Sequence, residues 1–528
     1  MGASRRARAT VLAIGASLLA TTVLAGAAAA TTRGGSSARR TRASAGSLTV
    51  LENSVGVSWP QGLNPLTNDS AEADQSLEDA IFGELFALGP GGKVINDLAA
   101  GAHLSNGART LTVDLRPGVR FTDGTPFDAA AVAYNFRKDL ASACTCTPPW
   151  QVASISTPSP TTVVVHLKTP DSAIVNQFED ANVNWIVSPT ALRRTPASRF
   201  DLFPVGAGPF EVVSDTVDSK LVLRRNPHYW QKGHPFLSEL TFLSTSGDES
   251  ALEDLRSGVG QAYEGMTTTS LVSAYRSAGL TVTAEPSSSV DDVELNTLAP
   301  PFNNLKAREA LYYATNAPAL DKALNGGYTP VSQSFTSSTD LFYEPKVPGY
   351  RTFDLAKAKA LVKSLGGISF TLITGAGSNQ PISEALQAMY QQAGMKVSIT
   401  VVTLSQLIQD FQSHHWQAAL QGAGGFDPAS SFGLTFRYGC HVPFSGVCNP
   451  QLDALMAKAS TVTAPAGRAA LYHRIAQIVS NEAYDPFLFP AATFNIATKA
   501  VTGPGLTTTL PVFGFGPEIL WQDVKVAG

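Results

Sequence analysis

The chain lacks the short motifs that would identify a secreted hydrolase. It contains no Gly-x-Ser-x-Gly nucleophile motif, no His-Glu-x-x-His metal motif, and no Ser-x-x-Lys motif with its companion motifs. Serine, histidine and aspartate residues are scattered along any long chain, and their presence means nothing without geometry. We therefore predict no catalytic residues and no enzyme activity, and we keep a secreted hydrolase as the alternative from another functional class.

Charged residues are also scarce. They make up 15% of the chain, apolar residues make up 44%, and the formal net charge is −4. A chain without a basic excess is a poor partner for nucleic acids or anionic membrane surfaces, so we predict neither. The apolar fraction is sufficient for large cores, and 528 residues suggest about three domains. No internal repeat and no membrane span beyond the N-terminal segment are found.

Cysteine and histidine are too few to form an obvious metal site. The chain has 4 cysteines and 8 histidines, and the candidate ligand sets are His414-His415 and Cys144-x-Cys146. Adjacent histidines on a helix diverge by about 100° and seldom share one ion. Two cysteines in an oxidising compartment are more often oxidised than metallated. We predict no resident metal and no cofactor, and keep metal binding as an alternative.

The N-terminus has the pattern of an export signal. A basic start with three arginines precedes an apolar run from residue 11 to 27, and small residues at 27–30 resemble a cleavage zone. We expect cleavage of residues 1–30, although the run is just long enough to act as a retained membrane anchor. Residues 31–46 are rich in Ser, Thr, Arg and Gly and are predicted to form a disordered tether.

One stretch, residues 111–138, has a strong local pattern. Apolar and polar residues alternate over 111–115, which predicts a strand with one buried face. Two turn signals follow, Pro117-Gly118 and Asp123-Gly124. Asp128 is a plausible N-cap for a helix that begins at Ala129.

The order of residue types in this stretch resembles the signature of the solute-binding proteins of family 5, which serve peptide and nickel ABC transporters. The matching positions are Leu115-Arg116, Gly118-Val119, Phe121, Asp123-Gly124, Pro126, Ala129 and Val132. Ala131 replaces the acidic residue that is usual in the helix. Further matches to family motifs follow in order at residues 62–66, 206–210, 223–230, 301–314, 354–366, 386–402 and 449–486. The resemblance covers essentially the whole mature chain.

This resemblance implies an α/β fold of the periplasmic-binding-protein-like (type II) class, with two lobes and an extra subdomain. Lobe I would comprise residues 47–80, 185–285 and 487–528. The subdomain would comprise residues 81–184, and lobe II residues 286–486. The chain would cross between the lobes in hinge strands near residues 292–297 and 489–494.

The resemblance also implies a function: an extracytoplasmic substrate-binding protein of an ABC importer. Such a protein captures a peptide or similar small solute between its lobes and delivers it to a permease with its ATPase. We expect an exported monomer, periplasmic or on the cell envelope. Many relatives carry a lipid-attachment cysteine after a Leu-Ala-Gly triplet, but here Ala27 follows Gly26. Oligosaccharide, nickel or haem cargo, and a receptor that feeds a sensor, remain alternatives.

The family implies where the ligand is held. In relatives an aspartate three residues before an Asp-Pro pair binds the α-amine of the peptide, but Gly424 stands at that position, ahead of Asp427-Pro428. We therefore expect weak binding of peptides with free amino termini. Aromatic residues near these positions suit a planar ligand, although each could equally belong to a core. The candidate substrate-binding residues are Trp59, Asn296, Trp416, Gly424, Gly425, Phe426, Asp427 and Tyr438.

A disulfide is predicted between Cys440 and Cys448. Export supplies an oxidising environment, and four cysteines allow three pairings. The intervening segment contains Pro443 and Gly446 and can bend back. The state of Cys144 and Cys146 is left open.

Overall fold

A computed structural model describes residues 46–53, 62–68, 75–89, 93–142, 148, 150–179, 181–375, 379–423, 425–429, 433–510 and 518–527. The predicted export signal, Trp59, Gly424, Cys144 and Cys146 lie outside these residues. Within the described ranges, no helix combines the length and the apolar character needed to cross a membrane.

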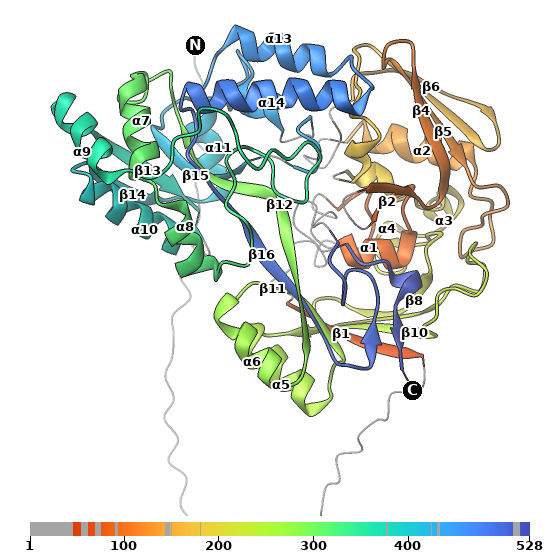
Figure 1. Ribbon diagram of the computed structural model, residues 1–528. Helices are drawn as coiled ribbons and strands as arrows, with labels where there is room; N and C mark the ends of the chain where they lie inside the picture. Colours follow the sequence, from red (N-terminus) through yellow and green to blue (C-terminus); the bar gives the residue numbers. More distant parts are fainter. Residues whose placement is uncertain are drawn as a thin grey trace, which may run out of the picture. The chain divides into compact units, whose positions relative to one another are not determined.

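The largest element is a mixed sheet of ten strands (Figure 1). From one edge to the other the strands are β14 (Lys396–Val401), β13 (Ser369–Thr374), β15 (Ala418–Ala423), β12 (Thr281–Leu295), β16 (Phe487–Ala497), β11 (Ala262–Met266), β1 (Ser47–Asn53), β10 (Glu239–Thr245), β9 (Lys220–Arg225) and β8 (Phe210–Thr216). Strands β1, β10 and β11 run parallel to one another, and so do β13, β14 and β15.

Two long antiparallel strands, β12 and β16, join these two parallel groups (Figure 1). The first half of β12 pairs with β16 only, and its second half also pairs with β15. The register of the β12–β16 pair shifts between Pro286 and Val290 and again before Asp292. Proline cannot donate to a ladder, which explains the irregularity at this point. The irregular pairing lies just N-terminal to the hinge range predicted near residues 292–297. The hinge itself stays a prediction.

A second sheet of four strands carries the stretch that stood out in the sequence. Its order is β4 (Ala99–Ser105), β5 (Thr110–Leu115), β7 (Thr162–Leu167) and β6 (Val152–Ser159). The predicted strand is confirmed as β5, and the predicted helix as α2 (Ala129–Asp139). Asp128 caps this helix, because its Oδ1 accepts from the backbone N–H of Ala131 at 2.9 Å.

The apolar spacing at residues 81, 85 and 88 predicts a helix over residues 77–88, but the helix in the structure is shorter. Helix α1 (Gln75–Phe82) ends before Gly83, and residues 86–89 form strand β2, paired with β3 (Lys93–Asn96). The apolar spacing fitted a longer helix because both elements are fully buried. The end of α1 packs directly on the backbone of residues 206–208. A Cβ at Gly206 would lie 2.3 Å from the carbonyl oxygen of Ile81, so this Gly-x-Gly serves close packing.

The remaining elements are helices on the two sheets and one short strand pair. The helices are α3 (Pro189–Arg194), α4 (Ala197–Phe200), α5 (Asp248–Ser257), α6 (Val272–Ser277), α7 (Leu305–Ala314), α8 (Ala317–Leu320), α9 (Leu355–Ser364), α10 (Asn379–Gln392), α11 (Leu404–Gln412), α12 (Leu434–Tyr438), α13 (Pro450–Ala459) and α14 (Pro465–Asn481). Strands β17 (Val501–Thr502) and β18 (Lys525–Val526) pair with each other.

The large apolar cores are built from different segments of the chain. One core draws on residues 48–82, 185–262 and 497–524, a second on residues 85–207, and a third on residues 293–489. This distribution favours the division into lobe I, subdomain and lobe II, whose bounds stay a prediction.

Two of the sequence motifs meet in space. The guanidinium of Arg116, from the first motif, lies over the ring of Trp230, from the second, 4.1 Å from the ring centroid. Asn226, also in the second motif, donates from Nδ2 to the carbonyl oxygen of Gly208 at 2.8 Å. The Arg116–Trp230 contact thus joins the predicted subdomain to predicted lobe I.

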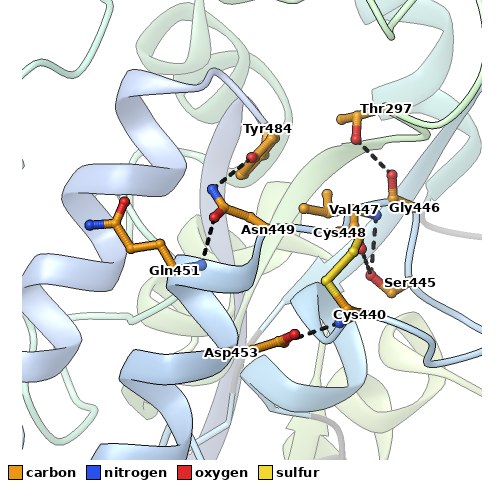
Figure 2. The surroundings of a disulfide bond; sticks show 10 residues. All are labelled: Thr297, Cys440, Ser445, Gly446, Val447, Cys448, Asn449, Gln451, Asp453 and Tyr484. Atoms are coloured by element: carbon orange, nitrogen blue, oxygen red, sulfur yellow. Dashed lines mark hydrogen bonds between the residues drawn. A yellow bond between two sulfur atoms is a disulfide. The ribbon is translucent and has the colours of Figure 1, made fainter.

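The structure contains the disulfide between Cys440 and Cys448, the pairing predicted from the sequence (Figure 2). It closes the loop between α12 and α13. The backbone N–H of Cys440 donates to Oδ1 of Asp453 at 3.1 Å, and Thr297 donates from Oγ1 to the carbonyl oxygen of Gly446 at 2.9 Å. The loop is therefore held to α13 and to the end of β12 as well as by the sulfur bridge.

Candidate functional site

The carboxyl ends of the parallel strands are where an open α/β sheet usually binds ligands. In lobe I these ends are residues 52–53 of β1, Thr245 of β10 and residues 264–266 of β11. In lobe II the corresponding ends belong to β13 and β15. The crossover strands β12 and β16 connect the two sets. A ligand that lies between the lobes would contact these ends.

Carboxylates line the lobe I side of this region. Glu52 and Glu264 are register partners on β1 and β11, so their side chains emerge side by side from one face of the sheet. Both are buried. The hydroxyl of Ser76, in α1, donates to Oε1 of Glu264 at 2.7 Å. Helix α1 thus begins beside the ends of these two strands.

The crossover adds a further buried acid, Glu285 in β12. Its Oε2 accepts from the backbone N–H of Leu510 at 2.9 Å, and its Oε1 has no hydrogen-bond partner. Burial raises the pKa of Glu285 to about 9, an effect that the Leu510 hydrogen bond partly opposes. This carboxyl is therefore protonated and neutral near pH 7.

On the lobe II side, Asp427 is fully occupied by protein groups. Its Oδ1 accepts from Nη2 of Arg468 at 2.6 Å and from the backbone N–H of Ala429 at 3.0 Å. Its Oδ2 accepts from Nδ2 of Asn176 at 2.7 Å. The side chain is completely buried. A carboxylate with both oxygens engaged in this way is not free to bind a ligand ammonium group.

The bond from Asn176 belongs to a wider contact between the subdomain and lobe II. Gln177 donates from Nε2 to the carbonyl oxygen of Ala429 at 2.8 Å. Ser172 donates from its backbone N–H to the carbonyl oxygen of Ser460 at 2.9 Å and from Oγ to that of Ala459 at 2.8 Å. The predicted subdomain therefore makes polar contacts with two parts of lobe II: the loop at residues 427–429 and the C-terminal end of α13.

Two of the predicted binding residues have contacts inside lobe II. Asn296 is fully buried and donates from Nδ2 to the carbonyl oxygens of Trp416, at 2.9 Å, and His414, at 3.3 Å. The Trp416 ring stacks on Phe411 with centroids 4.3 Å apart. These contacts fix the end of β12 against the start of β15. Ligand contact by Asn296 or Trp416 stays a prediction.

The remaining described candidates are also buried. Tyr438 donates from its hydroxyl to Oδ2 of Asp485. Gly425 and Phe426 precede Asp427 in the loop after β15, and the Phe426 ring packs with Leu88 of β2. Gly425, Phe426 and Asp427 therefore lie together where lobe II meets β2 and the subdomain, whereas Tyr438 lies in the lobe II core. Ligand contact by any of them stays a prediction.

Sequence reasoning missed a compact acidic cluster, formed by Asp79, Glu84 and Glu518. One carboxylate oxygen from each lies within 4.8 Å of the others, and all three side chains are buried. Burial and then the nearby charge of Glu518 raise the pKa of Asp79 well above its usual value. Burial and then Asp79 do the same to the pKa of Glu84. No local spacing relates residues 79 and 518, so only the fold reveals this cluster.

Within the described ranges, this cluster is the group of three or more side chains placed to hold a metal ion. His414 and His415 do not belong to such a group. Cys144 and Cys146, the other candidates from the sequence, lie outside the described residues.

The sequence matches a known family over most of its length. Residues 93–442 match the bacterial extracellular solute-binding proteins, family 5. The glutathione-binding protein GsiB of Shigella flexneri serotype 5b is 30% identical over 358 residues, which are 65% of this chain and 69% of that protein. GsiB of Escherichia coli K12 is 29% identical over 357 residues, with the same coverage of both chains.

Solved structures share the fold. HbpA2 from Haemophilus parasuis superposes with a TM-score of 0.78 at 20% identity, over 91% of this chain and 100% of that one. The substrate-binding protein CtaP of Listeria monocytogenes gives 0.76 at 21% identity, over 92% and 100%. A dipeptide-binding protein from Pseudoalteromonas sp. SM9913, solved with Met-Leu, gives 0.71 at 20% identity, over 90% and 100%. The fold is the two-lobed type II fold, and the chain belongs to the bacterial extracellular solute-binding proteins of family 5.

Proposed function

We propose that this protein is the extracytoplasmic receptor of an ABC importer, that it binds a peptide-like solute between lobe I and lobe II, and that it presents the loaded form to a permease. The observation that carries the proposal is family membership over residues 93–442, together with named relatives that bind glutathione and a dipeptide. The receptor acts outside the cytoplasm as a monomer, and binding involves no turnover of the ligand.

The arrangement of strand ends supports an extended ligand. Carboxyl ends of strands from both parallel groups are joined by the crossover strands β12 and β16, and such crossovers permit hinge closure. Exposed backbone groups at strand ends bind an extended peptide through main-chain hydrogen bonds, largely independently of its side chains.

The state of Asp427 supports weak recognition of a free α-amine. Gly424 has no side chain to pair with an ammonium group, and both oxygens of Asp427 are engaged by Arg468, Ala429 and Asn176. An ammonium group that is buried without a partner is costly. We therefore expect N-acetylated peptides to bind more tightly than the same peptides with free amino termini.

The first experiment is native mass spectrometry of the freshly purified, exported protein, because co-purified cargo identifies the ligand class directly. Calorimetric titrations then compare glutathione, a matched pair of free and N-acetylated dipeptides, and an oligosaccharide. Binding of a peptide-like ligand without chemical change supports the proposal. Consumption of the ligand would instead identify an enzyme, and tight binding of the oligosaccharide alone would change the cargo class.

A second test addresses the missing amine partner. Gly424→Asp restores the family carboxylate and should improve the binding of free-amine peptides relative to acetylated ones. The control is Gly422→Asp, at an exposed position two residues earlier. If the unmodified protein already prefers the free amine strongly, another carboxylate binds it. Small-angle scattering with and without the identified ligand completes the test, since hinge closure should compact the molecule.

A further inference from the structure

The acidic cluster of Asp79, Glu84 and Glu518 lacks a built-in positive charge. The charged groups that act most strongly on Glu84 are all acids: Asp79, Glu518, Glu179 and Asp97. Arg116 acts on Asp97, at the border of the cluster. Beyond residue 45, the chain segments outside the described ranges contain no Lys, Arg or His. Three carboxylates this close repel one another strongly unless a cation or protons neutralise them.

Each carboxylate of the cluster is oriented by a neutral N–H donor. Trp185 donates from Nε1 to Oδ1 of Asp79 at 2.8 Å, and Asn184 donates from Nδ2 to Oε1 of Glu84 at 2.9 Å. Gln75 donates from Nε2 to Oε2 of Glu518. Outer hydrogen bonds of this kind fix the carboxylates that ligate metal ions.

One oxygen atom of the cluster remains free. Oδ2 of Asp79 has no hydrogen-bond partner among the described residues, although this side chain is only 6% exposed. A buried oxygen without a partner is costly unless a proton, a water molecule or an ion satisfies it. A cavity of about 10 Å³ borders Asp79, Glu84 and Asp97, which is room for about one water molecule or one ion.

We propose that Asp79, Glu84 and Glu518 bind one calcium ion. The donor set consists of oxygen alone, which suits hard cations and disfavours zinc and copper. Three oxygens within 4.8 Å of one another lie at most about 2.8 Å from a common centre, so a small inward shift brings them to the distance of about 2.3–2.6 Å that Ca²⁺ prefers. Mg²⁺ demands near-ideal octahedral geometry, whereas Ca²⁺ accepts the irregular arrangement that three carboxylates from distant parts of the chain provide.

The site is separate from the strand ends assigned to the ligand, although both involve α1. Gln75 contacts Glu518 of the cluster, and the neighbouring Ser76 contacts Glu264 at the end of β11. Bound calcium would therefore hold the first turn of α1 in place beside the ligand region. The inference does not depend on which solute the receptor carries.

The test uses terbium, which substitutes for calcium and emits when a nearby tryptophan absorbs light. The full chain, stripped with EDTA and dialysed, should show sensitised Tb³⁺ emission that saturates at one ion per chain and is displaced by Ca²⁺. Trp185 is in contact with Asp79 and serves as the donor. Asp79→Asn and Glu518→Gln should each weaken Tb³⁺ and Ca²⁺ binding at least tenfold. Asp139→Asn, at a buried acid of α2 outside the cluster, should bind as the unmodified protein does.

Thermal unfolding of the unmodified protein keeps the inference testable if a variant fails to fold. Calcium should raise the Tm of the stripped protein, and magnesium at the same concentration should raise it less. The proposal is overturned if Tb³⁺ emission does not saturate or is not displaced by Ca²⁺. Equal affinity in the unmodified protein, Asp79→Asn and Glu518→Gln would overturn it too. Neither result would affect solute binding, so failure of this site and failure of the proposed function are distinguishable.

Discussion

Two buried groups of three acids, one in lobe II and one where predicted lobe I meets the predicted subdomain, differ in how their charge is balanced. In lobe II, Arg437 lies among Asp292, Glu294 and Asp485, donating from Nη2 to Asp292 and lying 3.5 Å from Asp485 and 3.6 Å from Glu294. Among the described residues, Asp79, Glu84 and Glu518 accept from neutral N–H groups, and no Arg or Lys is among the groups that act most strongly on them. Lobe II thus supplies its own cation, whereas burial and mutual repulsion raise the pKa values of Asp79 and Glu84 in the other group, for which we propose a metal ion as the balancing charge.

A third way of balancing charge is found at Glu285, a single buried acid in the crossover strand β12. Its raised pKa means that a proton balances it near neutral pH. Buried acids are therefore neutralised in three ways in this protein: by a guanidinium, by a proton and, as we propose, by a metal ion. The following variants test these assignments.

Removing the guanidinium should have the largest effect. Arg437→Met leaves three acids buried together, so we expect the free energy of unfolding to fall by about 3–5 kcal/mol. Urea unfolding followed by circular dichroism measures the change. Arg256→Met, in an exposed pair with Glu253, should cost less than about 1 kcal/mol. If Arg437→Met were equally mild, the lobe II acids would not depend on this cation.

The proton on Glu285 predicts a specific dependence on pH. Its pKa is about 9 in the folded protein and near 4.5 in the unfolded chain, so between these values the folded state holds an extra proton. The free energy of unfolding should fall as pH rises through this window, by up to about 1.4 kcal/mol per pH unit.

Glu285→Gln cannot ionise and should remove this component of the pH dependence. Urea titrations at pH 6 and pH 8 compare the variant with the unmodified protein, and Glu249→Gln, at an exposed position, serves as the control. The same dependence in all three proteins would mean that Glu285 is ionised when folded.

The disulfide between Cys440 and Cys448 lies close to Arg437 in the sequence. Removing each of them in turn therefore compares a covalent with an electrostatic constraint on the same region. Cys440 and Cys448 are 8 residues apart. Cys440→Ser with Cys448→Ser should lower the free energy of unfolding by about 2–3 kcal/mol in the chain-entropy model, less than Arg437→Met. A reductant should lower the free energy of unfolding of the unmodified protein by the same amount as the double substitution does. It should not change the free energy of unfolding of the double variant. A larger loss than that of Arg437→Met would reverse the order of the two constraints.

The smallest expected effect concerns Asp427, an acid already paired with Arg468. Asn176→Ala removes one of its three hydrogen bonds, at a cost of about 1 kcal/mol. Because this bond joins the subdomain to lobe II, we expect ligand affinity to fall by roughly fivefold if the contact stabilises the closed form. Gln151→Ala, exposed in the same subdomain, is the control for calorimetric titration. Unchanged affinity would mean that the contact persists when the lobes open.

The sequence predicted much of the fold because its patterns are local. The alternation at 111–115, the cap at Asp128 and the motif residues Arg116 and Trp230 report on short stretches, and the structure confirms these elements. The helix predicted to reach residue 88 was wrong because full burial hides the change from helical to strand periodicity at Gly83.

The candidate site was harder to predict from the sequence, because its residues are distant from one another along the chain. Asp427 makes one local hydrogen bond, accepted from the backbone N–H of Ala429 two residues later. Its bond to Asn176 crosses 251 residues. Glu518 lies 443 residues beyond its partner Gln75. No rule of sequence spacing connects such positions. The sequence alone also does not distinguish an acid that will be buried from one that will be exposed.

The long separation between these partners also affects the timing of folding. Trp521 donates from Nε1 to the carbonyl oxygen of Ser76, 445 residues earlier, and the core of lobe I contains both Leu48 and Val524. At 5–20 residues per second, a ribosome needs roughly 20 to 90 s to add those residues. During that interval β1 and α1 lack the segments that cover them. We therefore expect aggregation during synthesis or refolding to begin in this lobe, and chaperones that act on the nascent chain to bind there.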